Sequence, residues 1–266
     1  MKPLEQIKPE DRALITTVLC DIDDTITTEG RLTARAYQAL ERLQQGGFKV
    51  IPITGRPAGW CDHIARMWPV DAVVGENGAL WYRYDHRQRK MHQHYMMSDE
   101  QRRVSRQKLD ILKQTILEQV PGAGIASDQD FRIADLAIDF CEDVAPLGKS
   151  EIEKIVTLFE QAGATAKVSS IHVNGWFGSW DKLTMTRLMM KDCFGVDLDT
   201  SKQTIVFAGD SPNDAPMFGF FPNSVGMANV TDFVGQLPAA PAYITSRRAG
   251  DGFAELADFL LPLQEG

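Results

Sequence analysis

The 266-residue sequence lacks several features that would assign it to particular compartments or partners. Its four cysteines are far apart and form no CxxC pair, so we expect reduced thiols in a cytoplasmic protein. Basic residues do not predominate: 28 Lys and Arg stand against 36 Asp and Glu, and the net charge of −8 argues against nucleic acid as the main partner. No segment approaches the ~20 apolar residues that cross a bilayer, and the N-terminus has no signal-peptide pattern, so no membrane partner is expected.

What the sequence does contain, near its start, is an apolar run that ends in carboxylates. Residues 15–19 have the composition of a buried strand, and Asp21, Asp23 and Asp24 follow directly. In an extended chain Asp21 and Asp23 project to the same side. Two ionised carboxylates a few ångströms apart repel by roughly 4 kcal/mol at an effective dielectric near 20, so a shared proton, a cationic side chain or a metal ion must offset them. The alternative is a polar turn that caps the next element.

The order of predicted elements indicates an α/β fold with an insertion. In the first 75 residues, strands at 15–19, 48–53 and 71–75 alternate with helices at 33–45 and 58–68, which is typical of a Rossmann-like, doubly wound parallel sheet. The same alternation resumes after residue 181. We therefore predict a core formed by residues 1–83 and 179–266, interrupted by an α+β domain at 84–178.

After residue 75 the pattern changes to hairpins, which imply antiparallel pairing. We expect strands at 79–84 and 91–95, a helix from 98 to about 120, and a strand at 130–140. A helix with a capping box of Ser150 and Glu153 follows, and two short strands lie between 165 and 177.

A second acidic motif occupies residues 209–214, directly after the apolar strand 204–208. A helix start with Ser211 as N-cap, Pro212 at the first position and Asp214 as capping-box partner explains part of it. It does not explain Asp210, which ends the strand. If this strand lies beside the first one, four or five carboxylates meet in one crevice. Such oxygen ligands suit a hard divalent ion, most plausibly Mg²⁺.

Two further stretches point to phosphate binding. Thr54, Gly55 and Arg56 end another strand, where a hydroxyl and free backbone N–H groups can hold a phosphate oxygen, although such turns are common. Lys182 lies in the first turn of a helix, a position that is mildly unfavourable for a cation, so a role away from its own helix is plausible. A solvated surface lysine is the alternative.

Taken in order, these four stretches resemble the signature motifs of the haloacid dehalogenase superfamily. The insertion between the second and third motifs is similar to the α/β cap of subfamily IIB, which includes Cof-like sugar phosphatases, sucrose phosphatase and mannosyl-3-phosphoglycerate phosphatase. The stretch 75–79 around Asn77 also resembles that subfamily. Asp24 stands where many members have glycine, and some others carry an acid there.

The resemblance implies a phosphomonoester hydrolase that works through an aspartyl-phosphate. Asp21 would be the nucleophile, and Asp23 would protonate the leaving alcohol and later deprotonate water. Mg²⁺ would be held by Asp21, the backbone carbonyl of Asp23, and Asp210, with support from Asp214.

The resemblance also implies how the phosphate and the leaving group are bound. The phosphoryl oxygens would be held by Thr54, Gly55, Lys182 and Asn213. The cap would select the leaving group, with candidate substrate contacts at Arg56, Asn77, Arg132, His172, Asn174 and Trp176. For the cap residues the alternatives are ordinary: core packing for the tryptophan, a satisfied strand residue for the histidine and a surface charge for Arg132.

The predicted substrate is a small phosphorylated metabolite, a phosphosugar or a sugar phosphoglycerate. A phosphosugar mutase or phosphotransferase using the same aspartyl-phosphate is one alternative. A non-catalytic metabolite-binding protein is another, although all the required acids are present. The sequence sets no expectation for the oligomeric state.

Overall fold

A computed structural model describes residues 1–261, and its centre is a six-stranded sheet in which all pairings are parallel. This confirms the predicted α/β class. The strands, in spatial order, are β1 (Lys2–Pro3), β15 (Tyr243–Ile244), β14 (Asn223–Gly226), β13 (Ile205–Gly209), β2 (Thr17–Cys20) and β5 (Lys49–Pro52). Strand β2, which precedes the first acidic motif, lies directly beside β13, which precedes the second. The predicted Mg²⁺ site requires these two strands to be neighbours.

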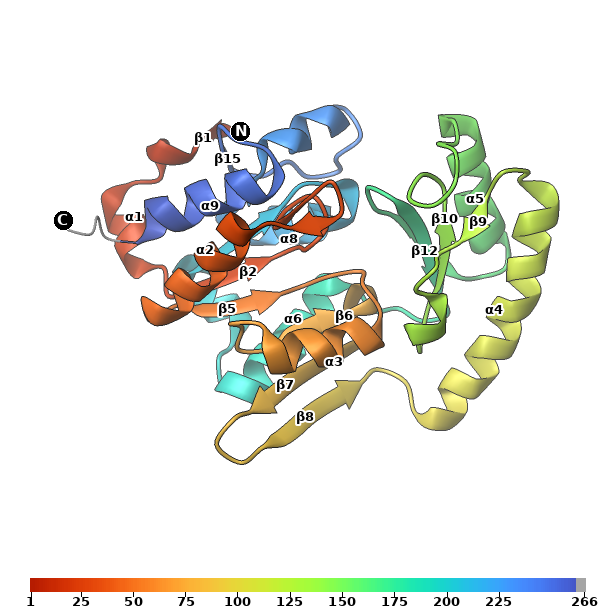
Figure 1. The fold of residues 1–266 in the computed structure, drawn as a ribbon, viewed down its shortest axis with the longest axis horizontal. Coiled ribbons are helices and arrows are strands. Elements are labelled where there is room, and N and C mark those ends of the chain that lie inside the picture. The colour runs from red at the N-terminus through yellow and green to blue at the C-terminus, as the bar shows by residue number, and fades with distance from the viewer. Residues whose placement is uncertain (262–266) are drawn as a thin grey trace.

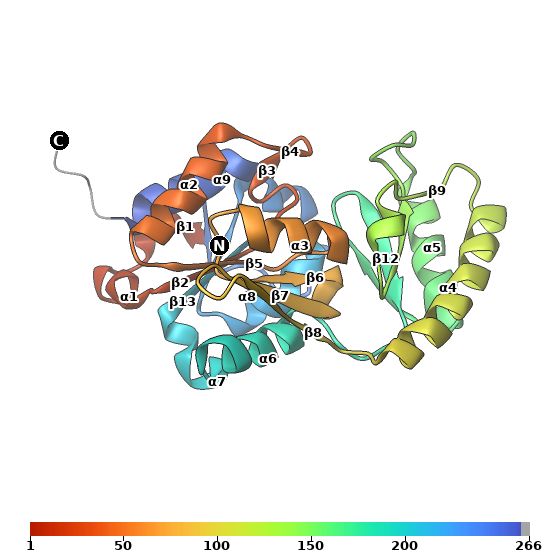
Figure 2. The same cartoon turned by 60° about the horizontal axis from the view of Figure 1, so that its bottom comes forward.

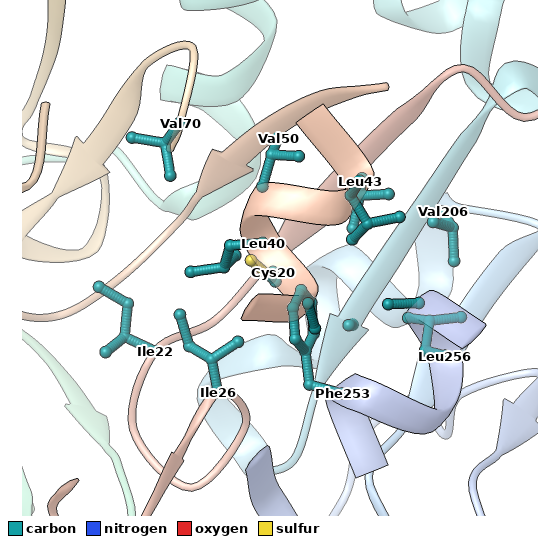
Figure 3. Packing of buried hydrophobic residues seen from close by; sticks show 14 of the residues in the cluster. Cys20, Ile22, Ile26, Leu40, Leu43, Val50, Val70, Val206, Phe253 and Leu256 are labelled. Carbon is teal, nitrogen blue, oxygen red and sulfur yellow. The ribbon is translucent and has the colours of Figure 1, made fainter. Parts of the chain in front are cut away.

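Helices cover both faces of this sheet, which is why its strands are apolar throughout. On one face lie α2 (Ala34–Gln45), α3 (Ala58–Met67) and α9 (Ala249–Leu260), and on the other α6 (Lys182–Phe194) and α8 (Ala215–Phe220). Figure 2 shows α2 and α9 on the opposite side from α6. Successive residues of β2 alternate between the two cores: Val18 and Cys20 contact the first, and Leu19 the second. Figure 3 shows the first core, where Leu40 and Phe253 pack beside Cys20.

A second, three-stranded sheet extends the core past residue 83. It contains β6 (Val73–Gly75), β7 (Leu80–Asp85) and β8 (Lys90–Tyr95), and a parallel bridge between Ile53 and Val74 joins it to the end of β5. Because β8 pairs with β7 along its whole length, it belongs with the core rather than with the insertion. We therefore propose that the inserted unit begins after β8 and not at residue 84.

The inserted unit has its own sheet and its own apolar core. The antiparallel order is β11 (Thr165–Val168), β12 (His172–Trp176), β10 (Leu136–Asp139) and β9 (Gly124–Ile125). The helices α4 (Asp99–Gln119) and α5 (Lys149–Gln161) pack on it through apolar residues such as Leu112 and Phe159. In Figure 1 this sheet lies between its helices and the core, so it faces the core.

Two predicted details of the insertion are wrong. The strand expected at 130–140 is confined to β10, because residues 129–131 form a 3₁₀ turn and the N–H groups of residues 133–135 bond to the Glu76 carboxylate instead of a neighbouring strand. The N-cap of α5 is Gly148, and the Ser150 hydroxyl bonds to Glu151 rather than to a backbone N–H. The capping box of Ser98 and Gln101 at the start of α4 is present as the pattern predicts.

Several short elements were not predicted. They are α1 (Pro9–Leu14), β3 (Thr27–Thr28), β4 (Arg31–Leu32) and α7 (Leu198–Ser201). The pair β3 and β4 forms a small hairpin just after the first acidic motif. Among the described residues, no helix combines the length and the apolar composition that crossing a membrane requires.

Candidate functional site

The candidate site lies where three parallel strands of the central sheet end. Asp21 follows β2, Thr54 follows β5 and Asp210 follows β13, and all three side chains are buried. The backbone continues the ladder to this point, since the N–H of Asp21 donates to the carbonyl of Ala208 at 2.9 Å. The carboxyl ends of parallel strands meet at one edge, where α/β folds bind their ligands. The inserted unit faces this edge (Figure 1).

Lys182 joins two of the predicted acids. Its ammonium lies 2.8 Å from Asp21 Oδ2 and 2.8 Å from Asp214 Oδ1, and the side chain is buried. The side chain of Asp181 caps α6 by accepting the N–H of Thr184 at 2.7 Å, so Lys182 leaves the first turn toward the sheet edge. Burial alone would lower the pKa of Lys182, but the two carboxylates outweigh it and raise the pKa above its usual range. The surface-lysine alternative is therefore wrong.

Three buried carboxylates form an acidic cluster. Asp21, Asp210 and Asp214 each place one oxygen within 4.8 Å of the others. Burial, opposed by Lys182, raises the pKa of Asp21 to about 7, and burial together with the charges of Asp214 and Asp21 raises that of Asp210 far above its usual range. One lysine does not neutralise three carboxylates. Three oxygen donors with excess negative charge in a buried site fit Mg²⁺.

Sequence analysis missed two polar residues that hold Asp210. The hydroxyl of Thr25 donates to Asp210 Oδ1 at 3.1 Å, and Asn229 Nδ2 donates to Asp210 Oδ2 at 3.1 Å. Thr25 lies within the first motif and could have been noticed. Asn229 lies in the 3₁₀ segment Ala228–Phe233, and its sequence neighbourhood gives no signal.

The side chain of Asp23 points away from this cluster, toward Arg56. The Arg56 guanidinium bonds both carboxylate oxygens of Asp23, at 2.8 to 3.0 Å, and also lies 3.2 Å from Asp128 and 3.0 Å from Glu142 in the inserted unit. Burial alone would lower the pKa of Arg56, but the carboxylates of Asp23 and Glu142 outweigh this effect and raise the pKa well above its usual range. Because these three carboxylates already occupy the guanidinium, the geometry favours a role in positioning Asp23 over the predicted substrate contact.

The predicted contacts from the inserted unit are mostly engaged elsewhere. Arg132 is buried between Asp128 and Asp135 and donates to the carbonyl of Gly55 at 2.9 Å, so it is no surface charge. Asn174 donates to Asp135 at 2.9 Å. Both residues line the cavity over Asp21, but Asn174 bonds within the inserted unit, and Arg132 bonds both within that unit and to the core.

The two aromatic predictions have different outcomes. Trp176 is 1% exposed and stacks on Trp180, so it is a packing residue and does not present a face to a sugar. His172 Nε2 lies 2.9 Å from Glu142 Oε2 and borders the cavity over Asp21, where it stays a candidate contact.

Glu76, for which no role was predicted, joins the inserted unit to the core through hydrogen bonds. Its buried carboxylate accepts the N–H of Ala58 at 2.9 Å on the core side. On the other side it accepts the N–H groups of Ile133 at 2.9 Å, Ala134 at 2.7 Å and Asp135 at 3.2 Å. Burial raises the pKa of Glu76 to about 7. The pairing spans 57 to 59 residues of chain, which no local pattern indicates.

Two of the four predicted phosphate-binding residues border a very small cavity. Gly55 and Asn213 border it together with Asp21, and its volume is about 10 Å³, room for about one water molecule. Thr54 lies beside it with Oγ1 accepting the N–H of Arg56 at 3.0 Å. The side chain of Asn77 packs against Gly55, where a Cβ would come within 3.1 Å of it. A cavity of this size has no room for a phosphate ester.

Three comparisons with known proteins bear on this site. The family model described as haloacid dehalogenase-like hydrolase matches residues 18–134, which include the first two motifs. This stretch of the chain is similar to the haloacid dehalogenase-like hydrolases. This confirms the resemblance drawn from the four motifs and the prediction of an enzyme.

Relatives of known description cover nearly the whole chain. A phosphoglycolate phosphatase from Nitrosopumilus maritimus (strain SCM1) is 26% identical over 251 residues, 93% of this chain and 96% of its own. The sucrose-phosphatase of Synechocystis sp. PCC6803 superposes with a TM-score of 0.63 at 15% identity, covering 92% of this chain and 97% of its own. A subclass IIB sugar phosphatase of the superfamily gives a TM-score of 0.63 at 15% identity, with coverages of 92% and 98%. The two structures share the fold.

The contacts of Glu142 with Arg56 and His172 give a pH-dependent prediction. His172 and Arg56, against the effect of burial, lower the pKa of Glu142 from 4.5 to about 2. A carboxyl group whose pKa is lower in the folded than in the unfolded state stabilises the fold at pH values above its unfolded-state pKa. This stabilisation is lost as the pH falls through the folded-state pKa. Urea unfolding should therefore show Glu142→Gln less stable than the wild type near neutral pH. The difference in unfolding free energy between the two proteins should become smaller below about pH 4.5. A difference that stays constant down to about pH 3 would contradict these contacts.

Proposed function

We propose that the chain is a magnesium-dependent phosphomonoester hydrolase that forms an aspartyl-phosphate on Asp21 and acts on a small phosphorylated metabolite, a phosphosugar or a sugar phosphoglycerate. The observation that carries this proposal is the position of Asp21. Its carboxylate lies at the end of β2, paired with Lys182 and within the acidic cluster, and it borders the cavity beneath the inserted unit. The relatives named phosphoglycolate phosphatase and sucrose-phosphatase support a phosphate ester of a small carbon skeleton.

The proposed reaction has two steps at phosphorus. A carboxylate oxygen of Asp21 attacks the phosphorus atom, the ester P–O bond breaks, and Asp23 transfers its proton to the leaving oxygen. Water then attacks the phosphorus of the aspartyl-phosphate, and Asp23 takes a proton from that water. The P–O bond to Asp21 breaks, inorganic phosphate leaves, and both aspartates return to their starting states.

The other residues stabilise charge and fix geometry. Lys182 is charged and buried beside Asp21, so it can donate to the phosphoryl oxygens in the transition state, with Thr54, the backbone of Gly55 and the Asn213 amide as further donors. Arg56 orients Asp23. Mg²⁺, when held by Asp21, Asp210, Asp214 and the Asp23 carbonyl, would offset their negative charge and polarise the phosphoryl group.

Removing the metal tests this proposal. Purified protein should hydrolyse p-nitrophenyl phosphate in the presence of Mg²⁺, and excess EDTA should lower the rate by about 100-fold or more, since no metal would then offset the charge of the dianionic substrate beside the acidic cluster. Restoring Mg²⁺ should restore the rate, and Asp210→Asn should need more Mg²⁺ for half-maximal activity. Full turnover in EDTA would refute the metal site.

The phosphotransferase alternative uses the same Asp21 chemistry with a sugar hydroxyl in place of water. Incubation with a hexose 1-phosphate separates the two: inorganic phosphate indicates a hydrolase, and the hexose 6-phosphate indicates a mutase. A folded protein that binds Mg²⁺ but turns over no phosphate ester would support the non-catalytic alternative.

A further inference from the structure

A second cavity adjoins the small one over Asp21. Its volume is about 390 Å³, and it lies between α3, the β3–β4 hairpin and the 3₁₀ turn Gln129–Phe131 of the inserted unit. Asp23 and Arg56 border both cavities. The apolar part of the wall is formed by Leu32, Trp60, Ile64, Trp68 and Phe131. We call this cavity the aromatic groove.

Two aromatic residues at the groove are held in place although they are exposed. Trp60 is 42% exposed, and the Arg56 guanidinium lies 4.6 Å from its ring centroid. Phe131 is 56% exposed and packs on Gly59, where a Cβ would come within 3.0 Å of its ring. The absent side chain of Gly59, in the first turn of α3, makes room for Phe131. The groove is thus a formed surface shared by the core and the inserted unit.

The position of Asp23 says which part of a substrate would face this groove. If Asp21 attacks phosphorus and Asp23 protonates the leaving oxygen, the leaving group lies on the Asp23 side. The cavity over Asp21, at about 10 Å³, cannot also hold a sugar or an aryl ring. Another groove of about 770 Å³, near Phe233, also reaches the site, but Asp23 does not border it.

We infer that the aromatic groove is the leaving-group subsite and that it takes a ring with a flat apolar face, an aryl group or the C–H face of a sugar. Its volume lies within the range of small-molecule sites, about 300–1,000 Å³. Trp60 and Phe131 offer ring faces for stacking, and Asp23 at the inner end, held by Arg56, meets the leaving oxygen. This inference rests on the proposed phosphatase function.

The test compares substrates with and without a ring. The value of kcat/KM is measured for 1-naphthyl phosphate, glucose 6-phosphate and acetyl phosphate. The value for each ring substrate is then divided by the value for acetyl phosphate. The ratio cancels any general effect of a mutation on catalysis. Trp60→Ala and Phe131→Ala should each lower a ring ratio by about 10-fold, mainly through KM, because one stacking face is lost. The two ring substrates distinguish an aryl group from a sugar.

Phe233→Ala is the matched control, since it removes an aromatic ring from the other groove and should leave the ratios unchanged. The inference would be overturned if Trp60→Ala and Phe131→Ala both left the kcat/KM ratios unaltered, or if only Phe233→Ala lowered them. Either result would leave the phosphatase proposal intact. A wild-type protein that releases phosphate from none of the three substrates would instead refute the proposed function itself.

Discussion

Asp21→Asn will lower kcat for p-nitrophenyl phosphate by about 10⁴-fold or more, because an amide cannot serve as the attacking carboxylate. The loss should not come from unfolding. Burial, opposed by Lys182, raises the pKa of Asp21 to about 7, so its charge is costly where it lies, and a neutral isostere relieves that cost while losing one ion pair. The melting temperature should stay within about 5 °C of the wild type.

Asp24→Asn is the matched control for this variant. Asp24 is three residues away and has a positive φ of 52°, a conformation that asparagine tolerates. It lies outside the acidic cluster, and we assign it no catalytic role. Its substitution should change kcat by no more than a few-fold. An Asp21→Asn protein with near wild-type turnover would place the nucleophile elsewhere.

The second large effect is expected at Lys182. Lys182→Met leaves Asp21 and Asp214 buried without their shared counter-charge, which should reduce the free energy of unfolding by about 3–5 kcal/mol. Losing the donor for the phosphoryl oxygens should also lower kcat by about 10²–10³-fold. Chemical denaturation and steady-state kinetics measure the two effects separately.

A double variant separates the two roles of the lysine. Adding Asp214→Asn to Lys182→Met removes one of the uncompensated charges and should restore part of the stability but none of the activity. Lys191→Met, an exposed lysine in the last turn of the same helix, should change neither quantity. A Lys182→Met protein as stable and as active as the wild type would contradict the buried ion pairs.

The sequence predicted the parts of the site that follow from strand order. The apolar runs that become β2 and β13 end in Asp21 and Asp210, and parallel pairing brings strand ends together whatever the loops do. Lys182 was predicted from its unfavourable position in the first turn of α6, and the structure turns its side chain to these acids. For these three residues, the local sequence pattern and the order of the strands lead to the same prediction.

What could not be predicted depends on side chains that meet across long stretches of chain. The bonds of Arg56 to Asp128 and Glu142 span 72 and 86 residues and join two units with separate cores. No periodicity indicates them, so the position of Arg56 between the two units was not predicted. Trp176 is on the same face of β12 as His172 and Asn174, which border the cavity, but at the end of the strand its ring packs against Trp180.

The central claim is that the phosphoryl group passes through Asp21, and trapping that intermediate tests it most directly. Asp23→Asn lacks the base for the second step, so with p-nitrophenyl phosphate, whose leaving group needs little protonation, the aspartyl-phosphate should accumulate. After acid quench and borohydride reduction, peptide mass spectrometry should find residue 21 converted to homoserine, in proportion to the p-nitrophenol released in the first turnover. Release of p-nitrophenol with residue 21 unmodified, or with the label on another residue, would contradict the account.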